Sequence, residues 1–180
     1  MSAVRILPHY TYKDYCHWEG RWELIDGFPY AMSPAPLPRH QWVVANIIRE
    51  LGNAIKKSNC KNCKVYDFVD LKIEEDTILQ PDCSIVCGNT KKNYFDFPPT
   101  LVVEVLSEAT ALKDRHTKFS IYEEFGVKYY LIVDPAKESL EIYLIENSKY
   151  TLQKFKIEKP FVFSLSDDCK IELITKNIWE

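Results

Sequence analysis

The sequence predicts a mixed α/β fold in which helices flank a central mixed β-sheet. Three features indicate this fold: a helical pattern over residues 40–57, an apolar run at residues 101–106, and a strand, helix and strand in succession over residues 101–133. A helix between two strands forms a right-handed crossover, so the runs 101–106 and 129–133 are expected to be parallel strands. An N-terminal hairpin and C-terminal antiparallel strands are expected to extend this core.

Composition and length set the class of protein. A chain of 180 residues with 46% hydrophobic and 27% charged residues can bury a core of its own, so one domain over residues 1–180 is expected. No apolar run is long enough to cross a membrane and residues 1–8 lack a signal-peptide core, which predicts a cytoplasmic protein without a membrane partner. The net charge of −3 excludes a uniformly basic surface but permits a local basic groove.

The first third of the chain is expected to hold a hairpin and a helix. Alternating stretches meet at Asp26-Gly27 within residues 22–30, which is a strong hairpin signal. Residues 33–38 carry three prolines and predict an extended connector that cannot be helical. Between residues 40 and 57 the apolar side chains recur with the period of an amphipathic helix.

The rest of the chain is expected to be rich in strands. Residues 65–73 and 77–87 predict two strands joined at Glu75-Asp76, and residues 101–106 predict a strand buried on both faces. A second helix is expected over residues 111–125, where Gly126 is suited to end it. Alternation over 129–133, 140–145, 150–155 and 171–174 predicts further strands, the last three as an antiparallel meander.

The six cysteines do not show the spacing of a zinc site. Cys60 and Cys63 have C-x2-C spacing, but Cys83 and Cys87 are four residues apart within one predicted strand, about 13 Å from each other. Such a second pair cannot easily share an ion with the first. Reduced cysteines that pack as small apolar residues are therefore expected, and disulfides are disfavoured by the cytoplasmic prediction.

Glu104 is the most informative residue, because it interrupts an otherwise apolar run. Burying an ionised carboxylate costs several kcal/mol unless a cation or several donors meet it. At about 100° per residue, Lys118 falls on the apolar half of the helix 111–125, with Leu112, Phe119, Ile121, Tyr122 and Phe125. Lys118 either pairs with Glu104 or pairs with Asp114 and reaches solvent; facing inward beside Glu104 is favoured.

Asp82 is the third candidate. Alternation places Gln80, Asp82, Ser84 and Val86 on one strand face and Cys83, Ile85 and Cys87 on the other. Two carboxylates and a lysine on adjoining elements are the residues that Mg²⁺-dependent phosphodiester hydrolysis requires. In that chemistry the lysine orients a water molecule or neutralises developing charge.

These residues lie in a series of motifs spread over nearly the whole chain. They are Trp22-Glu-Leu-Ile-Asp-Gly27, Met32-Ser-Pro-Ala-Pro36, His40, Leu79-Gln-Pro-Asp82, Pro98-Pro99, Val102-Val-Glu-Val-Leu-Ser107, Asp114, Lys118, Tyr122, Gly126-Val127 and Val133-Asp-Pro135. In order and spacing the sequence resembles the Uma2 family of the PD-(D/E)XK nuclease superfamily. The resemblance implies a restriction-endonuclease-like core and a homodimeric Mg²⁺-dependent DNA endonuclease, with Mn²⁺ as an alternative ion.

The resemblance also assigns roles to residues. Asp82 and Glu104 match the two acidic residues of the superfamily motif, and the Val105 carbonyl would be a further metal ligand. Leu106 stands where that motif has its lysine, and Lys118 matches the lysine that this family carries on the following helix. Where relatives often have Glu-Tyr-Trp, this chain has Tyr129-Tyr130-Leu131, so an accessory carboxylate is missing there.

Several other residues are candidates with two readings. His40 is a helix cap or packing residue, or a contact at the mouth of the site, and Glu23 is a solvated strand carboxylate or faces the metal. Of two basic clusters, Lys113, Arg115 and His116 are the better candidates for DNA backbone contact, while Lys56, Lys57, Lys61 and Lys64 are expected to be solvated. The alternative to an enzyme is a catalytically silent nuclease-fold module that binds DNA or protein or dimerises.

Overall fold

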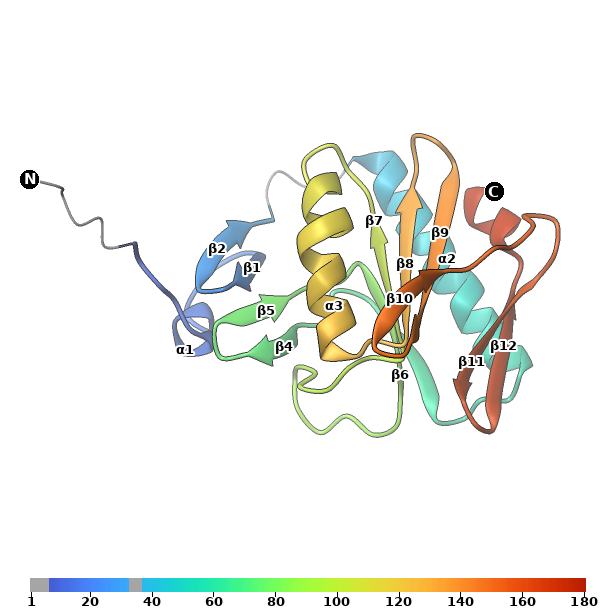
Figure 1. Ribbon diagram of the computed structural model, residues 1–180, viewed down its shortest axis with the longest axis horizontal. Helices are drawn as coiled ribbons and strands as arrows, with labels where there is room; N and C mark the ends of the chain where they lie inside the picture. Colours follow the sequence, from blue (N-terminus) through green and yellow to red (C-terminus); the bar gives the residue numbers. More distant parts are fainter. Residues whose placement is uncertain (1–6, 33–36) are drawn as a thin grey trace, which may run out of the picture.

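A computed structural model describes residues 7–32 and 37–180 of the chain (Figure 1). Residues 33–36, most of the proline-rich connector predicted at 33–38, lie outside this description, as do residues 1–6. The last connector residue, Pro38, was expected not to be helical, and that expectation is wrong. It is the first residue of a helix, a position where the missing amide hydrogen of proline costs nothing.

The strands form three sheets. The central sheet has six strands in the order β10-β9-β8-β7-β6-β3, a second sheet has the order β2-β1-β5-β4, and β11 and β12 pair with each other. The bounds are β1 (Trp22–Ile25), β2 (Phe28–Ala31), β3 (Cys63–Tyr66), β4 (Leu71–Glu74), β5 (Thr77–Leu79), β6 (Cys83–Cys87), β7 (Leu101–Val105), β8 (Tyr129–Asp134), β9 (Ser139–Glu146), β10 (Lys149–Leu152), β11 (Phe161–Ser166) and β12 (Cys169–Leu173). β7 and β8 are parallel and the other pairs are antiparallel, so the predicted mixed sheet is confirmed.

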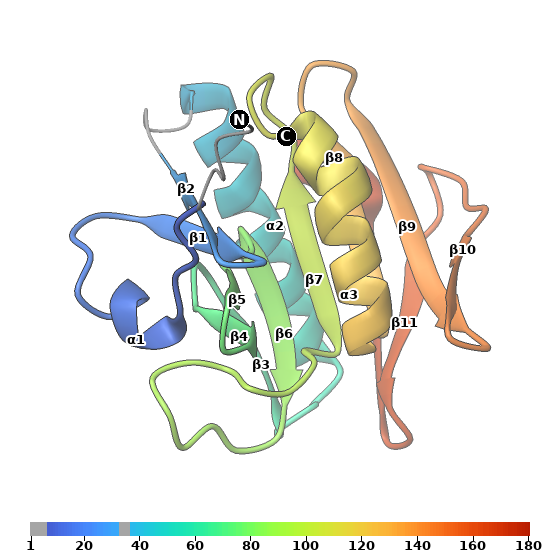
Figure 2. The same ribbon diagram turned by 60° about the vertical axis from the view of Figure 1, so that its left-hand side comes forward.

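Helices cover both faces of the central sheet (Figure 2). The helical segments are α1 (Tyr12–Tyr15), α2 (Pro38–Lys57), the π-helical η1 (Lys113–Lys118), α3 (Phe119–Phe125) and the 3-10 helix η2 (Thr175–Trp179). Leu101, Val103 and Val105 of β7 pack in the core beneath α2, whereas Val102 packs with the residues of α3. Glu104 is two residues from Val102 along β7. Because side chains alternate along a strand, Glu104 faces the same side as Val102, toward α3. In the described part of the chain, no helix is long and apolar enough to cross a membrane.

The predicted hairpin at Asp26-Gly27 is confirmed between β1 and β2, where both turn residues have positive φ. The two strands predicted at 65–73 and 77–87 are each broken, and only β4 and β5 pair across Glu75-Asp76. β3 and β6 pair with each other in the central sheet instead. Phe68 adopts a positive φ and Pro81 cannot donate to a ladder, so both interrupt their runs.

The predicted helix over residues 111–125 is confirmed, but its turn at 113–118 is π-helical. Leu112 was predicted on the buried half and is 78% exposed, so this expectation is wrong. A π turn contains more residues than an α turn, which shifts the phase of the residues before it relative to those after it. At the C-terminal end, Gly126 takes the left-handed conformation, as predicted.

The tail holds more strands than the sequence indicated. The runs at 140–145, 150–155 and 171–174 correspond to β9, β10 and β12, but β11 was not predicted. The prediction of a single antiparallel meander is wrong as well, because β12 is not part of the central sheet and pairs with β11. A signal was present, because Phe161, Phe163 and Leu165 alternate with less buried residues along β11.

The expectation of reduced cysteines is wrong for four of the six. Disulfides join Cys60 to Cys169 and Cys63 to Cys87, while Cys16 and Cys83 are free. The partners are separated by 109 and 24 residues, and only the tertiary fold brings them together. Cys83 and Cys87 lie on the same face of β6 and pack against the core beneath α2. Cys87 is bonded to Cys63, its register partner on β3, and Cys83 is free.

Candidate active site

Glu104 lies on the central strand β7 and is 3% exposed. Its Oε1 accepts hydrogen bonds from Lys118 Nζ at 2.9 Å and from the Tyr122 hydroxyl at 2.6 Å. The buried carboxylate predicted from the apolar run is therefore present, and a lysine and a phenol meet it. Both donors come from the helical segment 111–125 that crosses this face.

Lys118 is buried among carboxylates at 2% exposure. Its Nζ lies 2.7 Å from Glu23 Oε1, 2.9 Å from Glu104 Oε1 and 3.4 Å from Asp114 Oδ1. The predicted inward direction of this lysine is confirmed. The alternative, in which Lys118 pairs with Asp114 and reaches solvent, is wrong in its second half, because the ammonium group is enclosed.

Asp82 immediately precedes β6, the strand beside β7 in the central sheet. Cys83 is in register with Val103, which places Asp82 opposite Glu104 on the neighbouring strand. Asp82 Oδ2 accepts the Val105 amide at 2.8 Å and lies 3.4 Å from His40 Nε2. Of the two readings of His40, contact with the site therefore describes it, because this buried side chain reaches a candidate ligand from the first turn of α2.

Of the two alternatives for Glu23, the inward-facing one describes its position. It is 0% exposed, and its Oε1 accepts the Gln80 amide at 3.0 Å in addition to its contact with Lys118. Its Oε2 pairs with Lys113. The alternative of a solvated strand carboxylate is wrong. A signal was present, because in an alternating strand Glu23 shares a face with the apolar Ile25.

Burial and charge shift the acid–base behaviour of these groups. Burial raises the pKa of Glu104 well above its usual value, and the carboxylates of Asp114, Asp82 and Glu23 add to this effect although Lys118 opposes it. Burial alone would lower the pKa of Lys118, but the surrounding carboxylates outweigh it and the pKa is raised. Burial would raise the pKa of Glu23, yet Lys118 and Lys113 hold it below its usual value.

The same competition acts on two further groups. Burial raises the pKa of Asp114, which Lys118 only partly offsets. Burial would lower the pKa of His40, but its hydrogen bond to Asp82 raises it instead. Glu104 and Asp114 therefore hold a proton more readily than exposed carboxyl groups do, because Lys118 does not fully offset their burial.

The donor set fits an oxygen-preferring divalent cation. Of the four buried carboxylates, those of Glu23, Glu104 and Asp114 contact Lys118, and Asp82 contacts His40. Asp114 Oδ1 is buried without a hydrogen-bond donor. Within residues 7–32 and 37–180, no three His, Cys, Asp or Glu side chains form a ready metal cage; Mg²⁺ sites typically need only one or two carboxylates, with waters completing the shell.

The basic cluster expected to contact DNA near the site is already paired. Lys113 binds Glu23, and Arg115 Nη1 lies 2.7 Å from Glu141 Oε1. His116 is exposed. Lys113 and Arg115 therefore have carboxylate partners within the protein, and DNA contact by this cluster stays a prediction.

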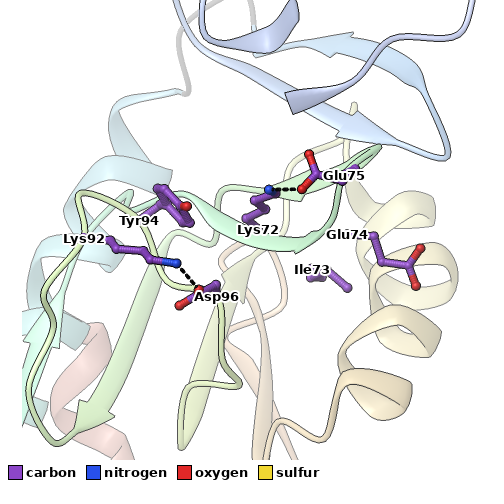
Figure 3. A pocket seen from close by; sticks show the side chains of 7 residues that line it. All are labelled: Lys72, Ile73, Glu74, Glu75, Lys92, Tyr94 and Asp96. Carbon is purple, nitrogen blue, oxygen red and sulfur yellow. Dashed lines mark hydrogen bonds and ion pairs between the residues drawn. The ribbon is translucent and has the colours of Figure 1, made fainter. Parts of the chain in front are cut away.

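A surface hollow lies elsewhere, between β4 and the loop that precedes β7 (Figure 3). Its walls carry Lys72 paired with Glu75 and Lys92 paired with Asp96, beside Tyr94. None of the buried ionisable residues of the Glu104 cluster lines it. Both lysines of this hollow are paired with carboxylates, so it does not present a free cation to a ligand.

Comparison with known proteins identifies the family and the fold of the chain. The family model described as "Uma2: Putative restriction endonuclease" matches residues 10–173. An uncharacterized protein of Synechocystis sp. (strain PCC 6803) is 29% identical over 147 residues, covering 76% of this chain and 75% of the relative. The crystal structure of a "putative nuclease belonging to DUF820" from Anabaena variabilis has a TM-score of 0.73 at 14% identity and covers 94% of this chain and 97% of its own. That structure establishes the likeness of fold, and the match over residues 10–173 shows that the chain belongs to the Uma2 family.

Proposed function

We propose that the chain is a Mg²⁺-dependent endonuclease that hydrolyses phosphodiester bonds in DNA, with Mn²⁺ as an alternative ion. The observation that carries the proposal is the buried contact between Lys118 and Glu104, with Asp82 opposite on the neighbouring strand. A lysine and two carboxylates at adjoining positions are the groups that metal-assisted phosphate hydrolysis requires. A homodimer, with one site for each DNA strand, completes the proposal.

In the proposed site, Asp82, Glu104 and the Val105 carbonyl would hold the ion. When bound, the ion supplies polarisation of a phosphate oxygen and a lowered pKa of water. Lys118 has three donor hydrogens, of which the contacts to Glu23 and Glu104 engage two. The third contact, to Asp114 Oδ1, is longer at 3.4 Å, so its donor is the one that would turn to water or to phosphate.

Other residues hold these groups in position. Tyr122 donates to the same oxygen of Glu104 as Lys118 does, so it fixes that carboxylate. The Val105 amide and His40 orient Asp82. Glu23 draws Lys118 toward the second sheet through a contact of 2.7 Å. A change in Tyr122, His40 or Glu23 is expected to act through the geometry of Glu104, Asp82 or Lys118, respectively.

One observation favours the alternative of a catalytically silent module. Lys118 is enclosed, and its three carboxylate neighbours already surround it. A closed ion cluster of this kind can serve as a structural element of a nuclease fold that binds DNA or protein or dimerises. Cleavage by the wild-type chain distinguishes the two functions.

The test is cleavage of supercoiled plasmid DNA in Mg²⁺ or Mn²⁺ by the wild type, Glu104→Gln and Glu108→Gln. Glu108 is an exposed carboxylate just beyond β7 and serves as the matched control. We expect Glu104→Gln to lose at least about 100-fold in rate, the scale of removing one electrostatic group from an active site. Glu108→Gln should cleave like the wild type.

Two results would argue against the proposal. Equal rates for the wild type and Glu104→Gln would exclude Glu104 from the chemistry. No cleavage by a folded wild-type chain with either ion would favour the silent module. Sedimentation of the same sample measures whether the chain is a dimer.

A further inference from the structure

Four cysteines from distant parts of the sequence meet at one corner of the molecule. Cys60 follows α2, Cys63 begins β3, Cys87 ends β6 and Cys169 begins β12. They form two disulfides that lie against each other, with Cys63 Sγ 3.7 Å from Cys169 Sγ. Cys60, Cys63 and Cys169 are buried in the core beneath α2. The four sulfur atoms thus occupy one compact volume.

The arrangement has the parts of a tetrathiolate zinc site. Cys60 and Cys63 have C-x2-C spacing on a tight turn, in which the Cys63 amide donates to the Cys60 carbonyl at 3.2 Å. Zinc binds thiolates at about 2.3 Å in a tetrahedron, whose edge between sulfurs is then about 3.8 Å. The contact of 3.7 Å between the two disulfides already equals that edge. Cys87 and Cys169 supply the second pair that the sequence seemed to lack.

The charges around the cluster suit such an ion. Four thiolates and one Zn²⁺ carry a net charge of about −2. Lys56, Lys57, Lys61 and Lys64 are exposed and lie within four residues of Cys60 or Cys63 along the chain. Nearby lysines favour the thiolate over the thiol, and the thiolate is the form that binds metal.

We propose that these four cysteines are a redox-dependent zinc site, disulfide-linked when oxidised and a Zn²⁺ tetrathiolate when reduced. Two molecules of a dithiol reductant supply four electrons and four protons, which break both S–S bonds and give four thiols, while each reductant closes to its own disulfide. Zn²⁺ then displaces the four protons and binds the four sulfurs. In either state the cluster joins α2, the edge strand β3 and the C-terminal hairpin.

This site is independent of the proposed nuclease chemistry. Cys60, Cys63 and Cys169 belong to the core beneath α2, whereas Glu104 and Lys118 lie on the α3 face of the central sheet. The zinc proposal therefore needs a readout other than DNA cleavage. Cobalt substitution supplies one, because Co²⁺ in a tetrahedral thiolate site has visible d–d and near-ultraviolet charge-transfer bands.

The experiment titrates Co²⁺ and then Zn²⁺ into the full chain, reduced with an excess of a dithiol-free phosphine under anaerobic conditions. We expect about one equivalent of Co²⁺ with tetrathiolate bands, displaced by about one equivalent of Zn²⁺. Cys63→Ser and Cys169→Ser should lose the tetrathiolate spectrum. Cys16→Ser and Cys83→Ser should keep it, since these two cysteines are free and outside the cluster. The oxidised chain should give no tetrathiolate bands.

Circular dichroism of each sample separates a lost site from a lost fold. A reduced wild-type chain that stays folded and gives no cobalt bands would overturn the proposal. A reduced chain that unfolds whether or not zinc is present would overturn it too, since the cysteines would then act only as disulfides. Loss of the bands in Cys83→Ser with its fold intact would also contradict the assignment of the four ligands.

Discussion

Lys118 is surrounded by more negative charge than one cation neutralises. Glu23, Glu104 and Asp114 all lie within 3.4 Å of its ammonium group. Buried ion pairs of this kind seldom stabilise a fold, because the cost of removing charges from water offsets their attraction. Apolar side chains in the place of these charged residues would pack as well. The cluster is therefore better explained by the function proposed for it than by stability.

At this residue, Lys118→Met is expected to destabilise the protein strongly. The substitution keeps the length of the side chain but leaves three buried carboxylates without their cation, which typically costs about 3–5 kcal/mol. Urea unfolding measures the change. Lys137→Met is the control, because Lys137 forms a surface ion pair with Asp134 and its loss should change stability by less than about 0.5 kcal/mol. A loss below about 1 kcal/mol in Lys118→Met would contradict the buried cluster.

The residues of the site differ in how well the sequence predicts them. Glu104 and Lys118 each break the apolar pattern of their own element, so local periodicity identifies them. For Glu23 and His40, the pattern of β1 and of α2 does not predict which residues of the site they contact. Their roles depend on how β1 of the second sheet and the start of α2 meet the site. Such contacts are tertiary, and no periodicity in β1 or α2 encodes them.

At the scale of elements, the helix over residues 111–125 separates predictable from unpredictable features. Its two ends follow from composition and from Gly126, and both were placed correctly. The hydrophobic pattern assumes the 3.6-residue period of an α-helix. It could not predict the π turn at η1, which has more residues per turn. This turn changes the direction of Leu112, while Lys118 still faces the sheet. π turns often occur at functional sites, which agrees with Lys118 being the last residue of η1.

Two glycines in helical surroundings are expected to respond to alanine in opposite directions. Gly126 ends α3 with φ 88°, where an L side chain costs about 1–2 kcal/mol. Gly52 lies inside α2, where a Cβ would meet no atom within 4 Å and alanine should stabilise by about 0.5–1 kcal/mol. Thermal unfolding of Gly126→Ala and Gly52→Ala tests the pair. A stabilising Gly126→Ala would contradict the left-handed cap.

The strands show a different limit of sequence reading. The run predicted at 77–87 divides into β5 and β6, which belong to two different sheets. Both pieces are apolar, so hydrophobic pattern alone joins them. The division depends on which partner each piece finds: β4 and β1 for β5, and β3 and β7 for β6. Strand existence is therefore local information, whereas strand pairing is not.

At the scale of the whole molecule, the cysteines connect elements that are far apart in the sequence. The Cys60–Cys169 bond attaches the C-terminal hairpin to the end of α2, and the Cys63–Cys87 bond ties β3 to β6. Spacing along the chain could not reveal either pair. The partners are 109 and 24 residues apart, and it is the fold of the sheets that brings them together. The correct partner for Cys87 became visible only in three dimensions.

The two disulfides are expected to differ in how much they stabilise the oxidised protein. In the chain-entropy description, a closed loop of 109 residues contributes about 4.8 kcal/mol and one of 24 residues about 3.4 kcal/mol. The double variant Cys60→Ser/Cys169→Ser should therefore lose more unfolding free energy than Cys63→Ser/Cys87→Ser, measured in denaturant without reductant. With reductant and a chelator, wild type and both variants should converge, because neither disulfides nor a bound metal then constrain the chain. If the variants still have a lower free energy of unfolding than the wild type under these reducing, metal-free conditions, the covalent links are not what stabilises this corner of the molecule. Packing of the sulfur atoms would then stabilise it.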